Sequence, residues 1–352
     1  MDLYRIFKLV IFISRVFCLA PFVAVEDSGT TRYKFSTFWL LYSILGMCAT
    51  FIFQINVLWI SVFIRGATVL NVTSKILSAA MCVASVVTQV LCLNNGKNVI
   101  RILDHVSILD SEHSGARISY YSLYKVFIVL LIYNIISLGA PYIMIFATIN
   151  TNSFHGLKVL YHTTVNFICD VVLMFSDTQF IHFILLLRHR FSVLNDTLIN
   201  FTVPSLYKTS LNRMIRTPAA DRSVNSSTSA VSSSNTVLKS TLRNVCRHHD
   251  ALCDISEFVN RTYSLQILLS VTITCIEVLF TTHSVSVEFS YSNILQYYSS
   301  KQILSMSAIV WMFALTAKVV LLVVVCNRAS HEVSGLHLWR PSVSFLNTWP
   351  TE

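Results

Sequence analysis

Four ionisable side chains interrupt long apolar segments in the second half of the sequence: Asp170, Asp177, Glu277 and Lys318. A charged group in apolar surroundings is costly, so it persists there only if it is paired or serves a function. Carboxylates accept hydrogen bonds and attract cations, whereas an ammonium group donates hydrogen bonds and attracts anions. These residues therefore predict either ion pairs between helices or a binding site for a small polar or cationic ligand.

Three of the candidate residues are expected at one depth. Counting ~1.5 Å per helical residue places Asp170 roughly 16 Å below Val159, and Trp311 about 14 Å below Gln302. Glu277 lies about 18 Å from the opposite end of its segment by the same count. Two carboxylates beside an indole ring suit a polyol, which needs hydrogen-bond acceptors and a ring face, or a cation held by charge and the π-face. We predict that Asp170, Glu277 and Trp311 contact a ligand.

Further polar and aromatic residues extend this candidate site. Asn166 precedes Asp170 by four residues, so both lie on one polar stripe that must face protein or water. Weaker candidates, because aromatic residues also gather at membrane boundaries, are Tyr133, Asn134 and Tyr161.

Asp177 and Lys318 are predicted to form a structural ion pair. Both come out roughly 24–27 Å from the outer surface by the same residue count. Opposite charges at one depth in hydrocarbon neutralise each other's cost. This pair is therefore expected to hold helices together rather than to bind a ligand.

The segments that carry these residues are long enough to cross a membrane. The 352 residues are 54% hydrophobic and 12% charged, whereas soluble domains are about a quarter charged, which excludes a soluble enzyme. A helix needs about 20 apolar residues to cross ~30 Å of hydrocarbon. Six stretches satisfy this: 36–64, 76–93, 126–149, 159–187, 265–287 and 302–326. The sequence predicts an all-α polytopic membrane protein, in contact with membrane lipid and with six membrane-spanning helices.

The distribution of basic residues predicts the orientation. With the N-terminus inside, the cytoplasmic segments hold 21 Lys and Arg residues and the outer segments hold 4. Short cytoplasmic connections are enriched in Lys and Arg, so the tally favours a cytoplasmic N-terminus. The excess of positive charge is thus topological, and we expect no nucleic-acid partner.

Five regions follow from this topology. Residues 1–35 are predicted as a cytoplasmic interfacial helix whose apolar face holds Ile6, Val10, Ile13 and Phe17, with a signal peptide as the alternative. Helices 1–4 occupy 36–187, and helices 5 and 6 occupy 264–326. Between them, 188–263 is expected to be cytoplasmic, with helical extensions around a disordered Ser-rich insert at 217–236. Residues 327–352 form the C-terminal tail.

The sequence contains no recognisable enzymatic machinery. We find no Gly-rich phosphate loop, nucleophile motif or metal-ligand spacing, and the nine cysteines have no paired spacing. We therefore expect no catalytic residues, cofactor, metal site or disulfide framework.

Several segments, in order along the chain, resemble insect gustatory receptors, and the fructose-receptor branch most closely. They are ISRVFCLAPF at 13–22, STFWLLYS at 36–43, TSK at 73–75, RHRF at 188–191, and VCN at 325–327 followed by SHEV at 330–333. This resemblance implies a ligand-gated cation channel in the plasma membrane of sensory neurons. It further implies seven spans per subunit, a homo- or hetero-tetramer of gustatory receptor subunits, and gating by a small-molecule tastant, with a sugar such as fructose as one candidate.

The C-terminal residues depart from the family pattern. Members end in a seventh span with a Thr-Tyr and Gln-Phe signature, but here the chain runs from Gly335 through Pro341 to Glu352 without an apolar segment of sufficient length. We therefore expect a truncated form that does not conduct alone. The alternatives are a G-protein-coupled type of receptor, which requires an outer N-terminus, and a non-conducting partner subunit.

Overall fold

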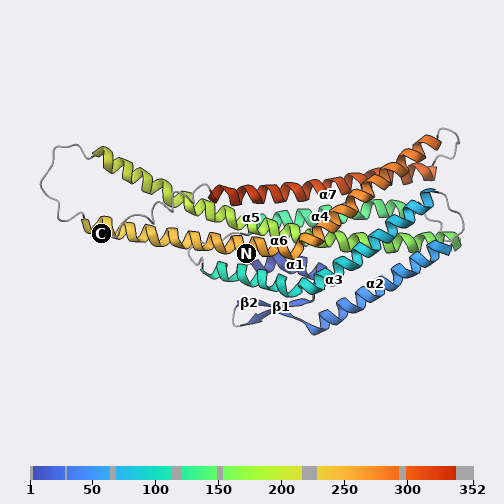
Figure 1. Cartoon of the computed structure of the whole chain (residues 1–352), viewed down its shortest axis with the longest axis horizontal. Coiled ribbons are helices and arrows are strands. Elements are labelled where there is room, and N and C mark those ends of the chain that lie inside the picture. The colour runs from blue at the N-terminus through green and yellow to red at the C-terminus, as the bar shows by residue number, and fades with distance from the viewer. Residues whose placement is uncertain are drawn as a thin grey trace. The chain divides into compact units, whose positions relative to one another are not determined.

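The computed structural model describes residues 3–27, 30–63, 69–112, 120–148, 154–215, 228–292 and 299–337 (Figure 1). Within these residues it contains seven helices and one hairpin. They are α1 (Leu3–Val16), β1 (Phe22–Asp27), β2 (Thr30–Phe35), α2 (Thr37–Phe63), α3 (Val69–Glu112), α4 (Tyr121–Thr148), α5 (Phe154–Ile215), α6 (Thr228–Ser292) and α7 (Ser299–His337). The prediction of an all-α polytopic membrane fold is confirmed.

Six helices are long and apolar enough to cross a membrane, and they correspond to the six apolar segments of the sequence. The candidate spans are Thr37–Asn56, Lys75–Asp110, Tyr121–Ala147, Val159–Ile199, Leu242–Val287 and Met306–Ser334. Such spans are helical because a helix satisfies its backbone N–H and C=O groups internally, as an apolar solvent requires.

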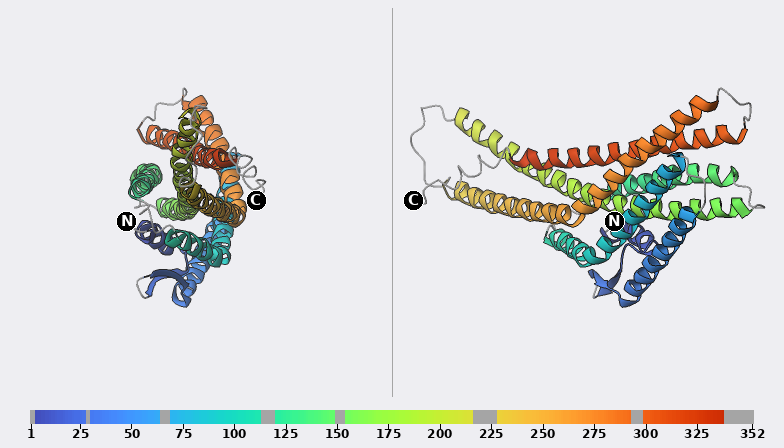
Figure 2. Two further views of the ribbon diagram at one scale, coloured as in Figure 1. Left: turned by 90° about the vertical axis from the view of Figure 1, so that its left-hand side faces the viewer. Right: turned by 45° about the vertical axis from the view of Figure 1, so that its right-hand side comes forward.

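The chain divides into two compact units. The first comprises Met1–Phe183 and Val259–Val324, and the second comprises Ile184–Phe258 and Val325–Glu352. Within the first unit, the other helices surround α5 (Figure 2). Most of the apolar window of α5, 83%, is buried, against 11% for α2 and for α7. The core of this unit is therefore built around α5.

Helix α1 packs into the first unit along a face next to the apolar face noted in the sequence. Its buried side chains are Phe7, Ile11 and Ser14. Ile13 and Phe17, which belong to the predicted apolar face, pack against the core while remaining only half-buried. The helix is apolar on several sides, so the residue pattern alone permits more than one buried face.

Ring contacts fix α1 against its neighbours. The Phe7 ring lies edge-on to Phe127 of α4, with centroids 5.8 Å apart, and 5.4 Å from Phe183 of α5. The Phe17 ring stacks on Phe175 of α5 at 4.9 Å. Aromatic pairs at these separations stabilise packing beyond simple area burial. The N-terminal helix is thus an integral part of the helical unit.

The hairpin of β1 and β2 follows α1 and was not predicted. Its strands pair antiparallel, with Phe22 opposite Phe35. Strand β2 packs against α3. A Cβ atom on Gly96 of α3 would lie 3.2 Å from Pro21 Cγ and 3.3 Å from the Phe35 ring, so glycine permits this close approach.

The second unit contains the remaining parts of α5, α6 and α7. Its buried apolar residues include Leu194, Leu198, Val245, Leu252 and Ile255. Helix α6 begins at Thr228, so helix occupies part of the 217–236 stretch that was expected to be disordered. The rest of that stretch lies outside the described residues, as do residues 338–352, on which the expectation of a missing seventh span depends.

Candidate functional site

Helix α5 carries an unusual series of buried polar side chains through the first unit. They are Asp170, Ser176, Asp177, Thr178, Gln179 and His182. A helix enclosed by other helices can retain such groups because they meet protein partners instead of lipid. The candidate site is therefore organised around α5, and its neighbours determine what each polar group can do.

Asp170 is buried and hydrogen-bonded to a residue that the sequence reasoning missed. The Tyr142 hydroxyl of α4 donates to Asp170 Oδ2 at 2.5 Å, and Asp170 is only 6% exposed. A hydrogen bond to a carboxylate is stronger than one between neutral groups. Only the depth of Tyr142, one turn from the level of Asp170 by residue counting, could have suggested it.

Trp311 reaches the same place through Tyr142. The two rings meet edge to face at 5.8 Å between centroids, and Tyr142 also contacts Phe167 at 4.9 Å and Phe146 at 6.2 Å. Helices α4, α5 and α7 thus converge on one phenol ring. The depth count brought Asp170 and Trp311 to one level, and the structure places Tyr142 between them.

Glu277 is a second buried carboxyl group in this neighbourhood. Its residue is 4% exposed, and it interacts electrostatically with both Asp170 and Lys318. Its Oε1 atom has no hydrogen-bond partner among the residues that the structure describes. Burying an acceptor without a donor costs free energy, so this oxygen favours any ligand that brings a hydroxyl or a positive charge.

Two further candidate residues face other helices. Asn166 Oδ1 accepts a hydrogen bond from Ser78 Oγ of α3 at 2.8 Å. The Tyr161 hydroxyl donates to the Phe53 carbonyl of α2 at 3.3 Å. Neither contact involves Tyr142. Asn166 and Asp170 lie one turn apart on the same polar stripe of α5, but Asn166 contacts α3 whereas Asp170 contacts α4.

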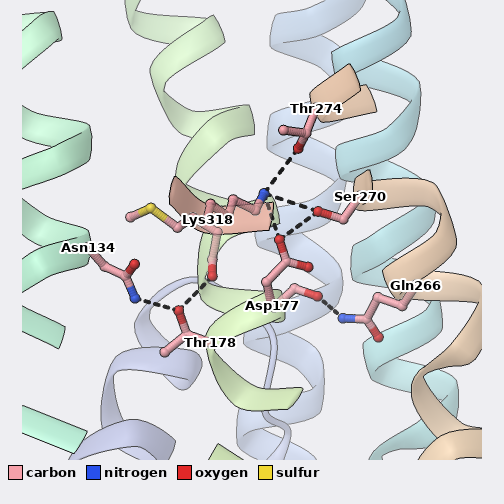
Figure 3. A network of polar contacts seen from close by, with 9 residues as sticks. Asn134, Asp177, Thr178, Gln266, Ser270, Thr274 and Lys318 are labelled. Atoms are coloured by element: carbon pink, nitrogen blue, oxygen red, sulfur yellow. Dashed lines mark hydrogen bonds and ion pairs between the residues drawn. The ribbon is translucent and has the colours of Figure 1, made fainter. Parts of the chain in front are cut away.

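The candidates on α4 lie about two turns from Tyr142. Asn134 Nδ2 donates to Thr178 Oγ1 of α5 at 2.7 Å (Figure 3). The Tyr133 hydroxyl is buried and has no hydrogen-bond partner among the described residues. Asn134 therefore joins α4 to α5, at a level different from that of Asp170.

Asp177 and Lys318 lie together in the network that joins α5, α6 and α7 (Figure 3). Lys318 Nζ is 2.6 Å from Asp177 Oδ2, and Ser270 Oγ donates to the same oxygen at 2.6 Å. Lys318 Nζ also donates to Ser270 Oγ at 3.1 Å and to Thr274 Oγ1 at 3.5 Å. The adjoining cavity has a volume of about 10 Å³, about the smallest that can hold one water molecule.

One helical turn along α6, a second polar contact continues this network. Gln266 Nε2 donates to Ser176 Oγ of α5 and, at 3.4 Å, to Cys92 Sγ of α3. The first of these contacts is also drawn in Figure 3. Four helices are thus cross-linked by polar side chains. Asp170 and Trp311 meet at Tyr142, and Asp170 and Glu277 interact electrostatically with Lys318 of this network.

Comparison with known families identifies the protein class. A model described as 7tm chemosensory receptor matches residues 7–338, which is most of the chain. The chain belongs to the 7tm chemosensory receptor family. Comparison with curated proteins gives no match. This multi-span membrane protein is therefore a chemoreceptor, and its family consists of receptors rather than enzymes.

The arrangement gives this chemosensory receptor two chemically distinct centres. The cluster of Asp170, Tyr142, Trp311 and Glu277 offers carboxylate acceptors beside aromatic rings. The Asp177–Lys318 network is charge-paired and tightly packed. Each centre has a carboxylate oxygen without a hydrogen-bond partner among the described residues, Glu277 Oε1 in the first and Asp177 Oδ1 in the second. In the second centre Lys318 already neutralises the carboxylate, whereas the first centre adds aromatic rings, so the first is the better candidate for recognition.

Proposed function

We propose that this chemosensory receptor is a gustatory receptor of the ligand-gated cation-channel type, which detects a small tastant at the cluster around Asp170. The observation that carries the proposal is the hydrogen bond from the Tyr142 hydroxyl to the buried Asp170 carboxylate, made by a phenol ring that also contacts Trp311 edge to face. A hydroxyl group already occupies the position that a polyol hydroxyl would take.

The tastant binds by exchange. Tyr142 swings away from Asp170, a ligand hydroxyl becomes the donor to Asp170 Oδ2, and Trp311 packs against the ligand's carbon face. Glu277 Oε1, which lacks a hydrogen-bond partner among the described residues, accepts a hydrogen bond from a second hydroxyl of the ligand. A small cation would use the same carboxylates and the indole π-face. A sugar such as fructose is our first candidate, consistent with the branch that the sequence most resembles.

Helix α7 carries binding to the rest of the receptor. Trp311 and Lys318 lie seven residues apart on α7, which is two turns or roughly 10 Å. Displacement of Trp311 by a ligand therefore shifts the helix that also holds the ion pair with Asp177. Exposed apolar residues on α7, such as Phe313 at 72% and Val323 at 60%, provide a surface for lipid or for neighbouring subunits.

The assembled receptor is proposed to be a homo- or hetero-tetramer of gustatory receptor subunits in the plasma membrane of sensory neurons. A ligand that moves α7 would act on a conduction path shared between subunits. The exposed apolar side of α7 supports this arrangement, because a helix with only 11% of its apolar window buried has most of its surface available to lipid or other chains.

Substitution of the acidic residues tests the binding cluster. The receptor is co-expressed with other gustatory receptor subunits, and calcium entry or current is measured against fructose as the polyol probe and tetraethylammonium as the cation probe. A hydrogen bond to a charged group contributes about 1.5–3 kcal/mol. Asp170→Asn should therefore raise the half-maximal concentration of the active probe by about 10- to 150-fold, with normal surface expression.

The matched control is Asp254→Asn, which neutralises an exposed carboxylate of the second unit. It should leave the dose response unchanged, whereas Glu277→Gln should shift it in the same direction as Asp170→Asn. An unchanged dose response for Asp170→Asn at wild-type surface levels would remove the cluster from tastant recognition.

A further inference from the structure

A cavity of about 390 Å³ opens between α1, β1 and α4, within the first unit. Its wall combines two basic residues, Lys8 and Arg15, with the apolar side chains of Leu9 and Phe12 and the ring of Tyr124. We propose that this cavity binds an anionic glycerophospholipid of the cytoplasmic leaflet, with the headgroup between the basic residues and an acyl chain against the apolar wall.

The charge of the cavity is suited to an anion. Lys8 and Arg15 are seven residues apart on α1, so they lie on one face about two turns apart. Its described lining residues include no carboxylate. Lys8 is exposed at the surface, where its ammonium group can reach a phosphate. A pocket with two cations and no acid favours a headgroup that carries net negative charge.

Arg15 is held in place at the wall. Its Nε donates to the Phe22 carbonyl of β1 at 2.8 Å, and its guanidinium lies 5.5 Å from the Trp39 ring centroid of α2. These contacts fix the position of the charge before any ligand arrives, and they explain why the hairpin that follows α1 contributes to the cavity. A preorganised guanidinium binds phosphate with little loss of side-chain entropy.

The apolar part of the wall provides a contact for an acyl chain, in addition to the contacts of the basic residues with the headgroup. Phe12 is 56% exposed although it lies on a helix whose other face is buried. Leu9 lies three residues earlier and lines the same cavity. Large apolar side chains left exposed beside cations are typical of surfaces that contact the boundary between headgroups and acyl chains.

The position of the cavity near the start of the candidate span of α4 favours a membrane lipid over a soluble phosphate as its ligand. Tyr124 lies three residues beyond Tyr121, where the candidate span of α4 begins, which is about 5 Å along the helix. Tyrosine at this depth is typical of the interface between headgroups and hydrocarbon. The distribution of basic residues puts this end of α4 on the cytoplasmic side, where anionic lipids are concentrated.

Lipid binding can be measured on the full chain purified in an uncharged detergent. Native mass spectrometry and thermal unfolding are followed while phosphatidylserine, or phosphatidylcholine with the same acyl chains, is added. We expect phosphatidylserine to bind and stabilise more strongly. Lys8→Gln should weaken phosphatidylserine binding about fivefold, which corresponds to ~1 kcal/mol per basic residue near an anionic surface. The control Lys97→Gln, an exposed lysine of α3 outside the cavity, should have no effect.

Two further measurements separate the lipid from its headgroup. Glycerophosphoserine, which lacks acyl chains, should neither stabilise the protein nor compete at the same concentration. Phe12→Gln should weaken the binding of both lipids about equally, because it removes a contact with the acyl chain and leaves the charge of the cavity unchanged. Equal binding of the two lipids to the unaltered chain, equal effects of Lys8→Gln and Lys97→Gln, or full competition by glycerophosphoserine would each overturn the proposal.

Discussion

Removing Lys318 should strongly destabilise the receptor, because it leaves a buried carboxylate without its counter-ion. Asp177 is 4% exposed, and its Oδ2 atom lies 2.6 Å from Lys318 Nζ. The Lys318 side chain is 21% exposed. Breaking a buried pair by removing one partner costs about 3–5 kcal/mol. In Lys318→Met, the Ser270 hydroxyl still donates to Asp177 Oδ2, but no cation faces this oxygen. We expect Lys318→Met to lower the free energy of unfolding by an amount within that range.

The assay is thermal unfolding of purified protein in detergent, together with surface expression in cells. A destabilisation of this size should lower the Tm on the order of 10 °C. The double variant Asp177→Asn with Lys318→Met should recover much of the loss, because the Asp177 carboxylate is no longer left without its counter-ion. Lys97→Met, which removes an exposed lysine of α3, is the matched control and should leave the Tm nearly unchanged.

The double-mutant cycle decides whether the two residues act as a pair. If Lys318→Met and Asp177→Asn each cost several kcal/mol and the double variant costs much less than their sum, the coupling is the ion pair itself. If the two losses simply add, or if Lys318→Met costs under ~1 kcal/mol, the pair does not stabilise the junction of α5, α6 and α7 and the reasoning fails.

Two other outcomes follow from the same unit. Tyr142→Phe removes the donor to Asp170 and keeps the ring, so a ligand hydroxyl no longer has to displace it. The half-maximal tastant concentration should fall about tenfold while surface expression stays normal; an unchanged or raised value would contradict the exchange of hydroxyl groups. Cys82 and Cys169 hold their sulfur atoms 3.9 Å apart between α3 and α5, so copper-phenanthroline with oxygen, which removes one hydrogen from each thiol, should form a disulfide between them. Peptide mapping under non-reducing conditions should find this bridge, and Cys82→Ser should abolish it; if the two sulfurs remain reduced while other thiols oxidise, the packing of α3 on α5 is incorrect.

The identity and depth of the spans could be read from the sequence. Long apolar runs without charges specify helices that cross hydrocarbon, and a fixed rise per residue converts sequence position into depth. That arithmetic brought Asp177 to the level of Lys318, and Asp170 to that of Trp311. Depth is one coordinate of each residue, and it depends on nothing outside its own helix.

The neighbours of each residue could not be read in the same way. Tyr142 was overlooked because its partnership with Asp170 depends on which face of α4 turns towards α5, and the sequence of α4 alone does not show this. The face of α1 that packs against protein could not be read from the sequence for a related reason: several of its sides are apolar, and contact with Phe127 and Phe183 selects one of them. The hairpin was missed because β1 becomes a strand only when β2 pairs with it.

The sequence by itself thus indicated a membrane protein, six apolar segments long enough to cross a membrane, and the positions of the charged groups along those segments, because hydrophobicity and helical rise are local properties of the chain. Only the tertiary structure decided that Tyr142 bridges Asp170 and Trp311, that Asn166 turns to α3 instead, and that Lys8 and Arg15 border one cavity. Those facts depend on the rotation of each helix about its axis. That rotation is set by the packing of side chains from distant segments, which no single stretch of sequence contains.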